Sequence, residues 1–283
     1  MSFINIIIPF IILISVVVFV HEYGHYYYAK KYGVKVTDFS IGFGKELFGW
    51  TDKDGTRWKV CLIPLGGYVK FFGDTNAASQ PEKISSFSED ERTHLLATKK
   101  LYQRAIIVSA GPIANFILAL FIFSCVYMFF GKDFSVPIIQ DVKIDSPAYK
   151  AGLKKGDQIV TINDQKITSM MEVSQFIALS DTNLIKITVL RDKKEYDFQV
   201  QSITQDTKDN LGNNISRKMI GIQIIPLNNE INRQKLGPAK AIYYSLKEIW
   251  FTISTTMSYV GKMIIGTEKA DQLGGPIKIA QIS

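Results

Sequence analysis

The hydrophobic positions of this chain fall into two long uncharged runs. Residues 1–20 carry no charged side chain and consist mainly of isoleucine, valine, leucine and phenylalanine, and residues 105–131 form a second uncharged run. A helix needs about 20 mostly apolar residues to cross a bilayer. Both runs meet this criterion. The pattern predicts an α-helical membrane protein with transmembrane helices over residues 1–30 and 105–131.

The first run could also be a cleavable signal peptide. Such a peptide has positive charge before its apolar stretch and a small-residue cleavage site after it. No lysine or arginine precedes this run, and no small-x-small site follows it. A retained transmembrane helix is therefore favoured.

The loop between the two runs, residues 31–104, is predicted to be cytoplasmic and to contain a β-hairpin. Residues 52–55, Asp-Lys-Asp-Gly, are a turn signal between strand-like stretches. Residues 30–104 carry thirteen lysines and arginines against nine acidic residues, whereas residues 1–29 carry no lysine or arginine. The positive-inside rule then places this loop in the cytoplasm and the residues after Gly131 outside.

The remaining sequence predicts a soluble domain and one more helix. Residues 136–203 contain short β-branched runs separated by turn signals, which predicts a small α+β domain, and residues 204–237 are a linker with a strand. Residues 238–266 place apolar side chains on one helical face. This helix is interpreted either as amphipathic, lying on the membrane or against the core, or as an ordinary half-buried helix. Residues 267–283 read as the approach to a further helix.

Composition removes several classes of protein. Apolar residues make up 47% and charged residues 21% of the 283 residues, so the chain is not intrinsically disordered. The two cysteines, Cys61 and Cys125, cannot form a disulfide framework, and no C-x-x-C pair exists for a cysteine-type zinc site.

The strongest chemical signal is the sequence His21-Glu22-Tyr23-Gly24-His25, which continues directly from the first apolar run. Residues four apart share one face of a helix. Two imidazoles in this spacing can bind one zinc ion, with the glutamate beside the metal as general base. The plainer interpretation is that these residues are the polar end of the helix. Their spacing, and the cost of ionisable groups near a membrane, favour the metal site.

Together with other motifs, this pattern resembles the site-2 protease family of intramembrane zinc metalloproteases, and most closely its bacterial members with an extracytoplasmic PDZ domain. The resemblance runs over essentially the whole chain. The motifs that carry it are His21–His25, Phe39–Gly44, Ile63–Lys70, Ala110–Phe116, Ser146–Ala148, Ala151–Asp157 and Leu273–Ala280.

The resemblance implies an α-helical membrane protein with a membrane-associated β-hairpin and an inserted α+β PDZ domain. It also implies that Glu22 is the catalytic base and that His21 and His25 bind Zn²⁺. Gly66, Gly67 and Tyr68 would offer a strand edge to an unwound substrate, and Asn115 would orient substrate or intermediate. From the residues alone, a tight turn is the preferred interpretation of the glycine pair. Asn115 could equally be a polar residue that packs helices.

The resemblance further implies zinc-dependent cleavage within transmembrane segments. The expected substrates are membrane-anchored regulators, such as anti-sigma factors already cut once outside, or signal-peptide remnants. The expected location is the bacterial inner membrane, with several spans and with the PDZ domain outside as a size filter or sensor. The partners are these substrates and the lipid bilayer, and no nucleic acid is expected.

One departure from the family keeps an alternative open. The family takes its third zinc ligand from an aspartate in a Leu-Asp-Gly motif, which these 283 residues do not contain. That ligand is expected beyond residue 283, and the 283-residue chain is expected to be incomplete and inactive alone. The alternative is a catalytically idle membrane-bound PDZ adaptor. A peripheral zinc protease of soluble type is disfavoured, because the histidine pair continues from a membrane span.

Overall fold

The computed structural model describes residues 3–75, 82–180, 182–208 and 214–266. Within that part the chain divides into two compact units, with the boundary between Phe121 and Ile122. The predicted approach to another helix, residues 267–283, lies outside the described residues.

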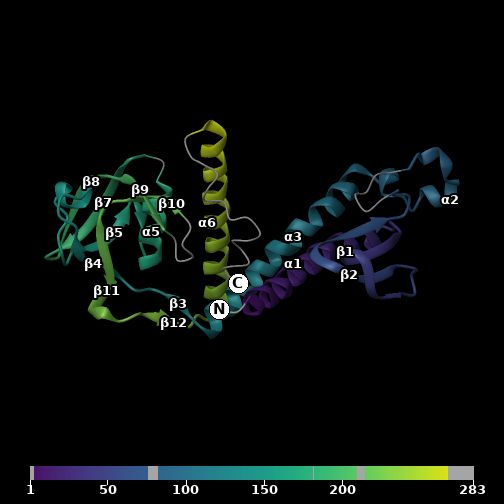
Figure 1. Ribbon diagram of the computed structural model, residues 1–283, viewed down its shortest axis with the longest axis horizontal. Helices are drawn as coiled ribbons and strands as arrows, with labels where there is room; N and C mark the ends of the chain where they lie inside the picture. Colours follow the sequence, from purple (N-terminus) through teal and green to yellow (C-terminus); the bar gives the residue numbers. More distant parts are fainter. Residues whose placement is uncertain (1–2, 76–81, 181, 209–213, 267–283) are drawn as a thin grey trace. The chain divides into compact units, whose positions relative to one another are not determined.

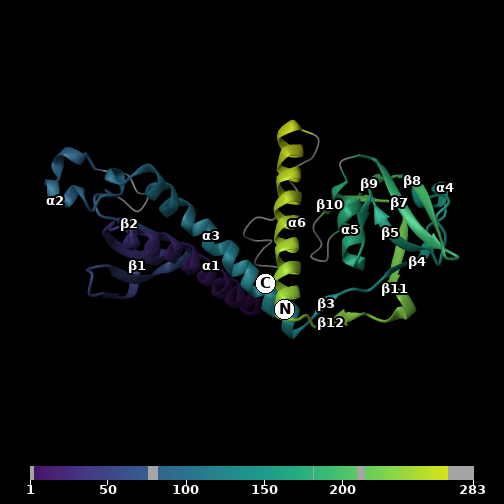
Figure 2. The same ribbon diagram turned by 180° about the vertical axis from the view of Figure 1, so that it is seen from behind.

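The first unit is built on two long helices, α1 (Phe3–Lys31) and α3 (Leu101–Phe129). The end of α3, from Ile122 onward, belongs to the second unit. The two helices lie side by side (Figures 1 and 2). By length and composition, Ile8–Lys31 and Leu101–Phe129 could each cross a membrane. Many of their large apolar side chains are exposed, among them Ile12, Val108 and Phe121. Such side chains suit a lipid environment better than water.

The two helices approach closely at small residues. A Cβ atom placed on Gly24 would lie 2.5 Å from the carbonyl oxygen of Ala110 and 3.0 Å from the Cβ of Ala114. Glycine and alanine allow helix backbones to come this near to each other. This crossing lays the segment His21–His25 directly against the segment Ala110–Asn115.

Between the long helices, β1 (Val36–Thr51) and β2 (Arg57–Phe71) form an antiparallel pair with several register shifts. The shifts arise because both strands bend back. Residues 36–41 pair with residues 67–71 and also with residues 57–60, and residues 46–51 pair with residues 57–61. Residues 67–71 therefore form one edge of this sheet.

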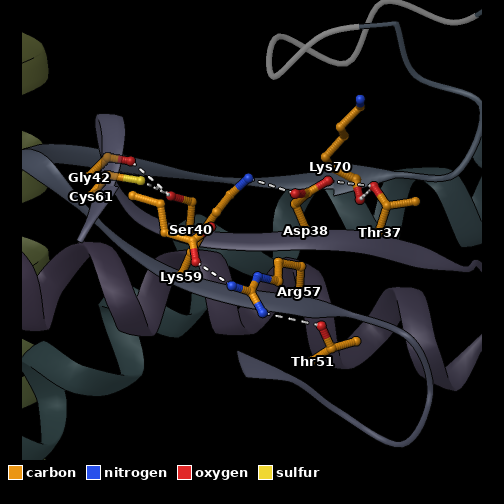
Figure 3. A network of polar contacts seen from close by, with 10 residues as sticks. Thr37, Asp38, Ser40, Gly42, Thr51, Arg57, Lys59, Cys61 and Lys70 are labelled. Carbon is orange, nitrogen blue, oxygen red and sulfur yellow. Dashed lines mark hydrogen bonds and ion pairs between the residues drawn. The ribbon is translucent and has the colours of Figure 1, made fainter. Parts of the chain in front are cut away.

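A polar network holds the sheet together (Figure 3). The ammonium of Lys59 donates to Asp38 at 2.6 Å, and the hydroxyl of Thr37 donates to the same carboxylate at 2.9 Å. Burial acts to raise the pKa of Asp38, but the hydrogen bonds from Lys59 and Thr37 outweigh it and hold this pKa below its usual value. The carboxylate is therefore charged at neutral pH.

The turn at residues 52–56 is fastened to α1. The carboxylate of Asp52 accepts hydrogen bonds from the indole of Trp58 at 2.9 Å and from the hydroxyl of Tyr26 at 3.3 Å. The Trp58 ring stacks on Phe39, whose side chain is buried in the core between α1 and the sheet. The sheet thus has a fixed position against the helix that carries the histidine pair.

Short elements join the sheet to α3. They are η1 (Ile84–Ser86), α2 (Glu89–Arg92) and η2 (Leu96–Thr98). Ser88 and Glu91 form a reciprocal capping box at the start of α2.

The second unit contains a mixed sheet-and-helix domain. Its strands are β4 (Pro137–Val142), β5 (Gln158–Ile162), β6 (Gln165–Lys166), β7 (Leu184–Arg191), β8 (Lys194–Gln201) and β11 (Ile222–Pro226). The sheet order is β11-β4-β5-β7-β8, with β6 on β5, and the helices are α4 (Pro147–Ala151) and α5 (Met170–Leu179). Strand β11 comes from the stretch predicted as linker and strand, yet it pairs with β4 in this sheet.

An aliphatic core and one buried ion pair stabilise this domain. Ile139, Ile162 and Ile187 are completely buried. The carboxylate of Asp157, 1% exposed, accepts hydrogen bonds from Arg191 Nε at 2.6 Å and Nη2 at 2.7 Å. This two-pronged pair joins the start of β5 to the end of β7.

The other elements of the second unit are two short antiparallel strand pairs, a 3-10 turn and a long helix. Strand β9 (Ile203–Lys208) pairs with β10 (Asn214–Met219), and β3 (Lys132–Asp133) pairs with β12 (Arg233–Gln234). The turn is η3 (Leu227–Asn229) and the helix is α6 (Pro238–Ile265). The start of α6 contacts the end of α3, where the hydroxyl of Tyr127 donates to Glu248 at 3.2 Å.

Candidate metal centre

His21 and His25 lie one turn apart on α1 and point to a common place. Their Nε2 atoms are 3.3 Å apart, and the ring planes are nearly perpendicular. Two ligand atoms on a tetrahedral zinc ion, with bonds of about 2.0–2.1 Å, are roughly 3.3 Å apart. The separation of the two nitrogens therefore fits the edge of a zinc coordination tetrahedron.

The ring of His25 is oriented by the facing helix. Its Nδ1 atom lies 2.7 Å from the backbone carbonyl oxygen of Ile107 on α3. A carbonyl oxygen can only accept, so this contact places the ring proton on Nδ1 and leaves Nε2 with a free lone pair. A metal-binding histidine commonly has such a contact on its other nitrogen.

Gly111 provides the space in front of the two rings. A Cβ atom on this residue would collide with Nε2 of His25 and would lie 2.8 Å from Nε2 of His21. Only glycine therefore leaves both nitrogens accessible at this position of α3. The opening lies where the lone pairs converge, so the residues present fit a bound zinc ion.

Glu22 lies on the side of α1 that faces the edge of the sheet. A Cβ atom on Gly67 would lie 3.2 Å from Cγ of Glu22, so the edge strand runs directly against this side chain. Gly66 has φ +152, and a Cβ atom on it would collide with the ring of Phe43. The glycine pair thus lets the edge strand, including Tyr68, lie close to the carboxylate.

Asn115 lies behind His21. Its Nδ2 atom is 3.2 Å from Nδ1 of His21, while its Oδ1 atom is buried without a hydrogen-bond partner among the described residues. Asn115 thus touches the outer nitrogen of the first histidine, as the Ile107 carbonyl touches that of the second.

A third ligand is not found in the part of the chain that the structure describes. No group of three or more histidine, cysteine, aspartate or glutamate side chains there is arranged to hold a metal ion. The remaining histidine, His94, has its Nδ1 atom 3.3 Å from the Gly33 carbonyl oxygen.

Three residues of this site, Gly24, Ile107 and Gly111, had no role in the sequence-based prediction. Gly111 was only part of the quoted motif Ala110–Phe116, with no task of its own. Ile107 acts through its backbone carbonyl, which leaves no trace in the side-chain pattern. Gly24 lies inside the histidine motif but serves the helix crossing rather than the metal. Its signal would have been the matching small residues, Ala110 and Ala114, on the other apolar run.

Comparison with known proteins agrees with this geometry. The chain matches the model of peptidase family M50 over residues 9–283. It is 40% identical over 279 residues to an Agrobacterium fabrum protein named "Putative zinc metalloprotease", covering 98% of this chain and 74% of that protein. It is 33% identical over 288 residues to Metalloprotease MmpA of Caulobacter vibrioides, covering 98% and 72%.

Two solved structures are similar to part of the chain. They are PDZ domains of SdrC-like proteins from Listeria monocytogenes and Listeria innocua, 23% and 27% identical, with TM-scores of 0.26 and 0.25. Each covers 32% of this chain, and the chain covers 88% and 92% of them. The sequence matches extend over nearly the whole chain and include the histidine pair. The chain therefore belongs to peptidase family M50, the site-2 protease family, and is a metalloprotease.

Proposed function

We propose that this protein is a zinc-dependent endopeptidase that cleaves peptide bonds within membrane-spanning segments. The observation that carries the proposal is the pair of Nε2 atoms of His21 and His25, 3.3 Å apart, facing a space that Gly111 keeps open. This pair lies on a helix long and apolar enough to cross a membrane.

Each residue of the site has a defined task. His21 and His25 hold zinc, which when bound makes water acidic enough to lose a proton near neutral pH and polarises a carbonyl. Glu22 accepts the proton of the attacking water and returns it to the leaving amine. Asn115, on α3, contacts Nδ1 of His21 and keeps that ring in its orientation.

The sheet edge supplies the place for the substrate. A transmembrane helix keeps its carbonyls in internal hydrogen bonds, so it must unwind before water can attack. The strand at residues 66–69 lies beside Glu22, and an extended substrate can pair with such an edge. Pairing with the strand gives the freed backbone groups of the substrate hydrogen-bond partners inside the membrane, where water is absent.

The far end of the sheet favours contact with lipid. Phe43, Leu47, Phe48, Leu62 and Leu65 are all more than 40% exposed. A cluster of apolar side chains of this size is typical of a surface that meets a membrane or a partner. We therefore place the hairpin in the membrane boundary, with residues 31–104 on the cytoplasmic side.

The biological setting follows from the same proposal. The protein would be a multi-pass protein of the bacterial inner membrane, with the PDZ-like domain outside as a filter that admits only trimmed proteins. Its substrates would be membrane-anchored regulators, such as anti-sigma factors, or signal-peptide remnants.

The deciding experiment is the variant Glu22→Gln. The whole protein, purified in detergent, is incubated with a transmembrane model substrate, and zinc content is measured in parallel. The variant should cleave less than about 1% as fast while zinc content stays unchanged, because an amide cannot take up a proton. Tyr23→Phe is the matched control, since this exposed neighbour lies on the same turn.

If Glu22→Gln cleaves at the normal rate, Glu22 is not the catalytic base. If the unaltered protein binds no zinc and cleaves no transmembrane substrate, the idle PDZ adaptor becomes the better account.

A further inference from the structure

The hydrogen bonds around the histidine pair all run in one direction. Nδ1 of His25 donates to the Ile107 carbonyl, so Nε2 of His25 carries no proton. Without a metal, a proton on Nε2 of His21 satisfies its 3.3 Å contact with Nε2 of His25, and the same separation suits two ligands of one zinc ion. Nδ1 of His21 is then a lone pair, and the amide of Asn115 donates to it at 3.2 Å. These contacts form one donor chain across the site.

This donor chain leaves one group unsatisfied. The Oδ1 atom of Asn115 is buried and accepts no hydrogen bond from any residue that the structure describes. Buried polar groups nearly always have partners, and a departure from this rule calls for an explanation. Here the orphan atom is on the residue that touches the first histidine.

Metal binding changes the role of Asn115 from hydrogen-bond donor to hydrogen-bond acceptor. Ligation through Nε2 requires that this nitrogen of His21 gives up its proton. The neutral ring must then carry its proton on Nδ1, where it would face the N–H₂ group of Asn115. A half-turn of the side-chain amide exchanges the two nearly isosteric groups, so that Oδ1 accepts from Nδ1–H.

We propose that Asn115 is a positioning residue that holds His21 in its metal-binding tautomer through Oδ1. The inference rests on the proposed zinc site. Its effect parallels that of the Ile107 carbonyl on His25, and each histidine then has an acceptor on its outer nitrogen.

The test measures zinc affinity by competition with a chelator in the whole detergent-purified protein. Asn115→Leu keeps a similar volume but has no acceptor, and it should bind zinc about 10–100-fold more weakly. Asn115→Asp keeps acceptor oxygens and lacks the N–H₂ group, so its affinity should stay within about threefold of the unaltered protein or rise. Ser109→Ala is the control, since this exposed hydroxyl bonds only to carbonyls of its own helix.

Two results would overturn the proposal. If Asn115→Leu binds zinc as tightly as the unaltered protein, the contact does not position the ligand. If Asn115→Asp loses as much affinity as Asn115→Leu, the amide acts as donor and the acceptor role is wrong. If the unaltered protein itself binds no zinc, the proposed function fails instead.

A second measurement does not depend on the folding of the leucine variant. The chain has only three histidines, so ¹⁵N-histidine spectra are simple to assign. In the zinc-loaded protein, His21 should show a protonated Nδ1 and an unprotonated Nε2, and without metal the reverse. A protonated Nε2 on His21 in the loaded protein would contradict the proposal.

Discussion

The substitution Gly111→Ala should separate metal binding from stability more cleanly than any other change in the chain. In the interior of a helix, alanine is about 1 kcal/mol more favourable than glycine. In this place, however, the added methyl would collide with Nε2 of His25 and lie 2.8 Å from Nε2 of His21. The methyl must push at least one ring away from the metal.

The size of the effect follows from the energy per ligand. Structural zinc sites with four ligands bind with about 10–16 kcal/mol, so displacing one ligand costs roughly 3–4 kcal/mol. At about 1.4 kcal/mol for each factor of ten, zinc affinity should fall by roughly 10²–10³-fold. Thermal stability without metal should change little, because the gain in helix propensity of about 1 kcal/mol offsets the hydrogen bond to Ile107 that the His25 ring loses as it moves away.

The assay combines a chelator competition with a thermal melt of the metal-free protein. Gly261→Ala on α6 is the matched control, because a Cβ there meets nothing within 4 Å. This control should show the helix-propensity gain alone, with zinc affinity unchanged. Normal zinc affinity in Gly111→Ala would show that the two imidazoles do not converge in front of this residue.

Three further changes test the surroundings of the site. Gly24→Ala should lower both thermal stability, by about 1–3 kcal/mol, and zinc affinity, because its methyl meets the backbone of the facing helix; an unchanged melt would argue against the close crossing. Asp157→Asn should destabilise the sheet-and-helix domain of the second unit by about 3 kcal/mol, since Arg191 loses its buried partner, and protease resistance of that domain reports it. The lowered pKa of Asp38 means that its contribution to stability is present above its unfolded pKa of about 4 and is lost as pH falls through the lower folded value. Asp38→Asn should therefore flatten the acid limb of the melting temperature below about pH 4, and an unchanged slope would refute the role of its pair with Lys59.

The sequence contained enough information for the helices and for one side of the site. Two uncharged runs are a property of composition alone, and the four-residue spacing of His21 and His25 places both rings on one helical face. Both inferences use only neighbours in the chain. The β-structure between the helices and the amphipathic helix from Pro238 are local patterns of the same kind.

The rest depends on contacts between distant segments. The orientation of His25 comes from a backbone carbonyl 82 residues away, and a carbonyl has no sequence signature. Asn115 had two equal interpretations until the structure placed it against His21. Strand β11 was visible as an apolar stretch, but its pairing with β4 joins segments about 80 residues apart. Residues 36–41 pair with two other segments, and the bends in β1 and β2 interrupt the alternation of apolar and polar residues that would have indicated this pairing in the sequence.

The central claim is that His21 and His25 together hold zinc, and zinc K-edge absorption of the purified protein tests it most directly. The account predicts one zinc per chain, with imidazole nitrogens at about 2.0–2.1 Å, and a loss of that zinc in the double variant His21→Ala, His25→Ala. The variant His94→Ala should leave the spectrum unchanged, since this exposed side chain lies at the Gly33 carbonyl. A double variant that keeps the same zinc content and the same spectrum would contradict the account.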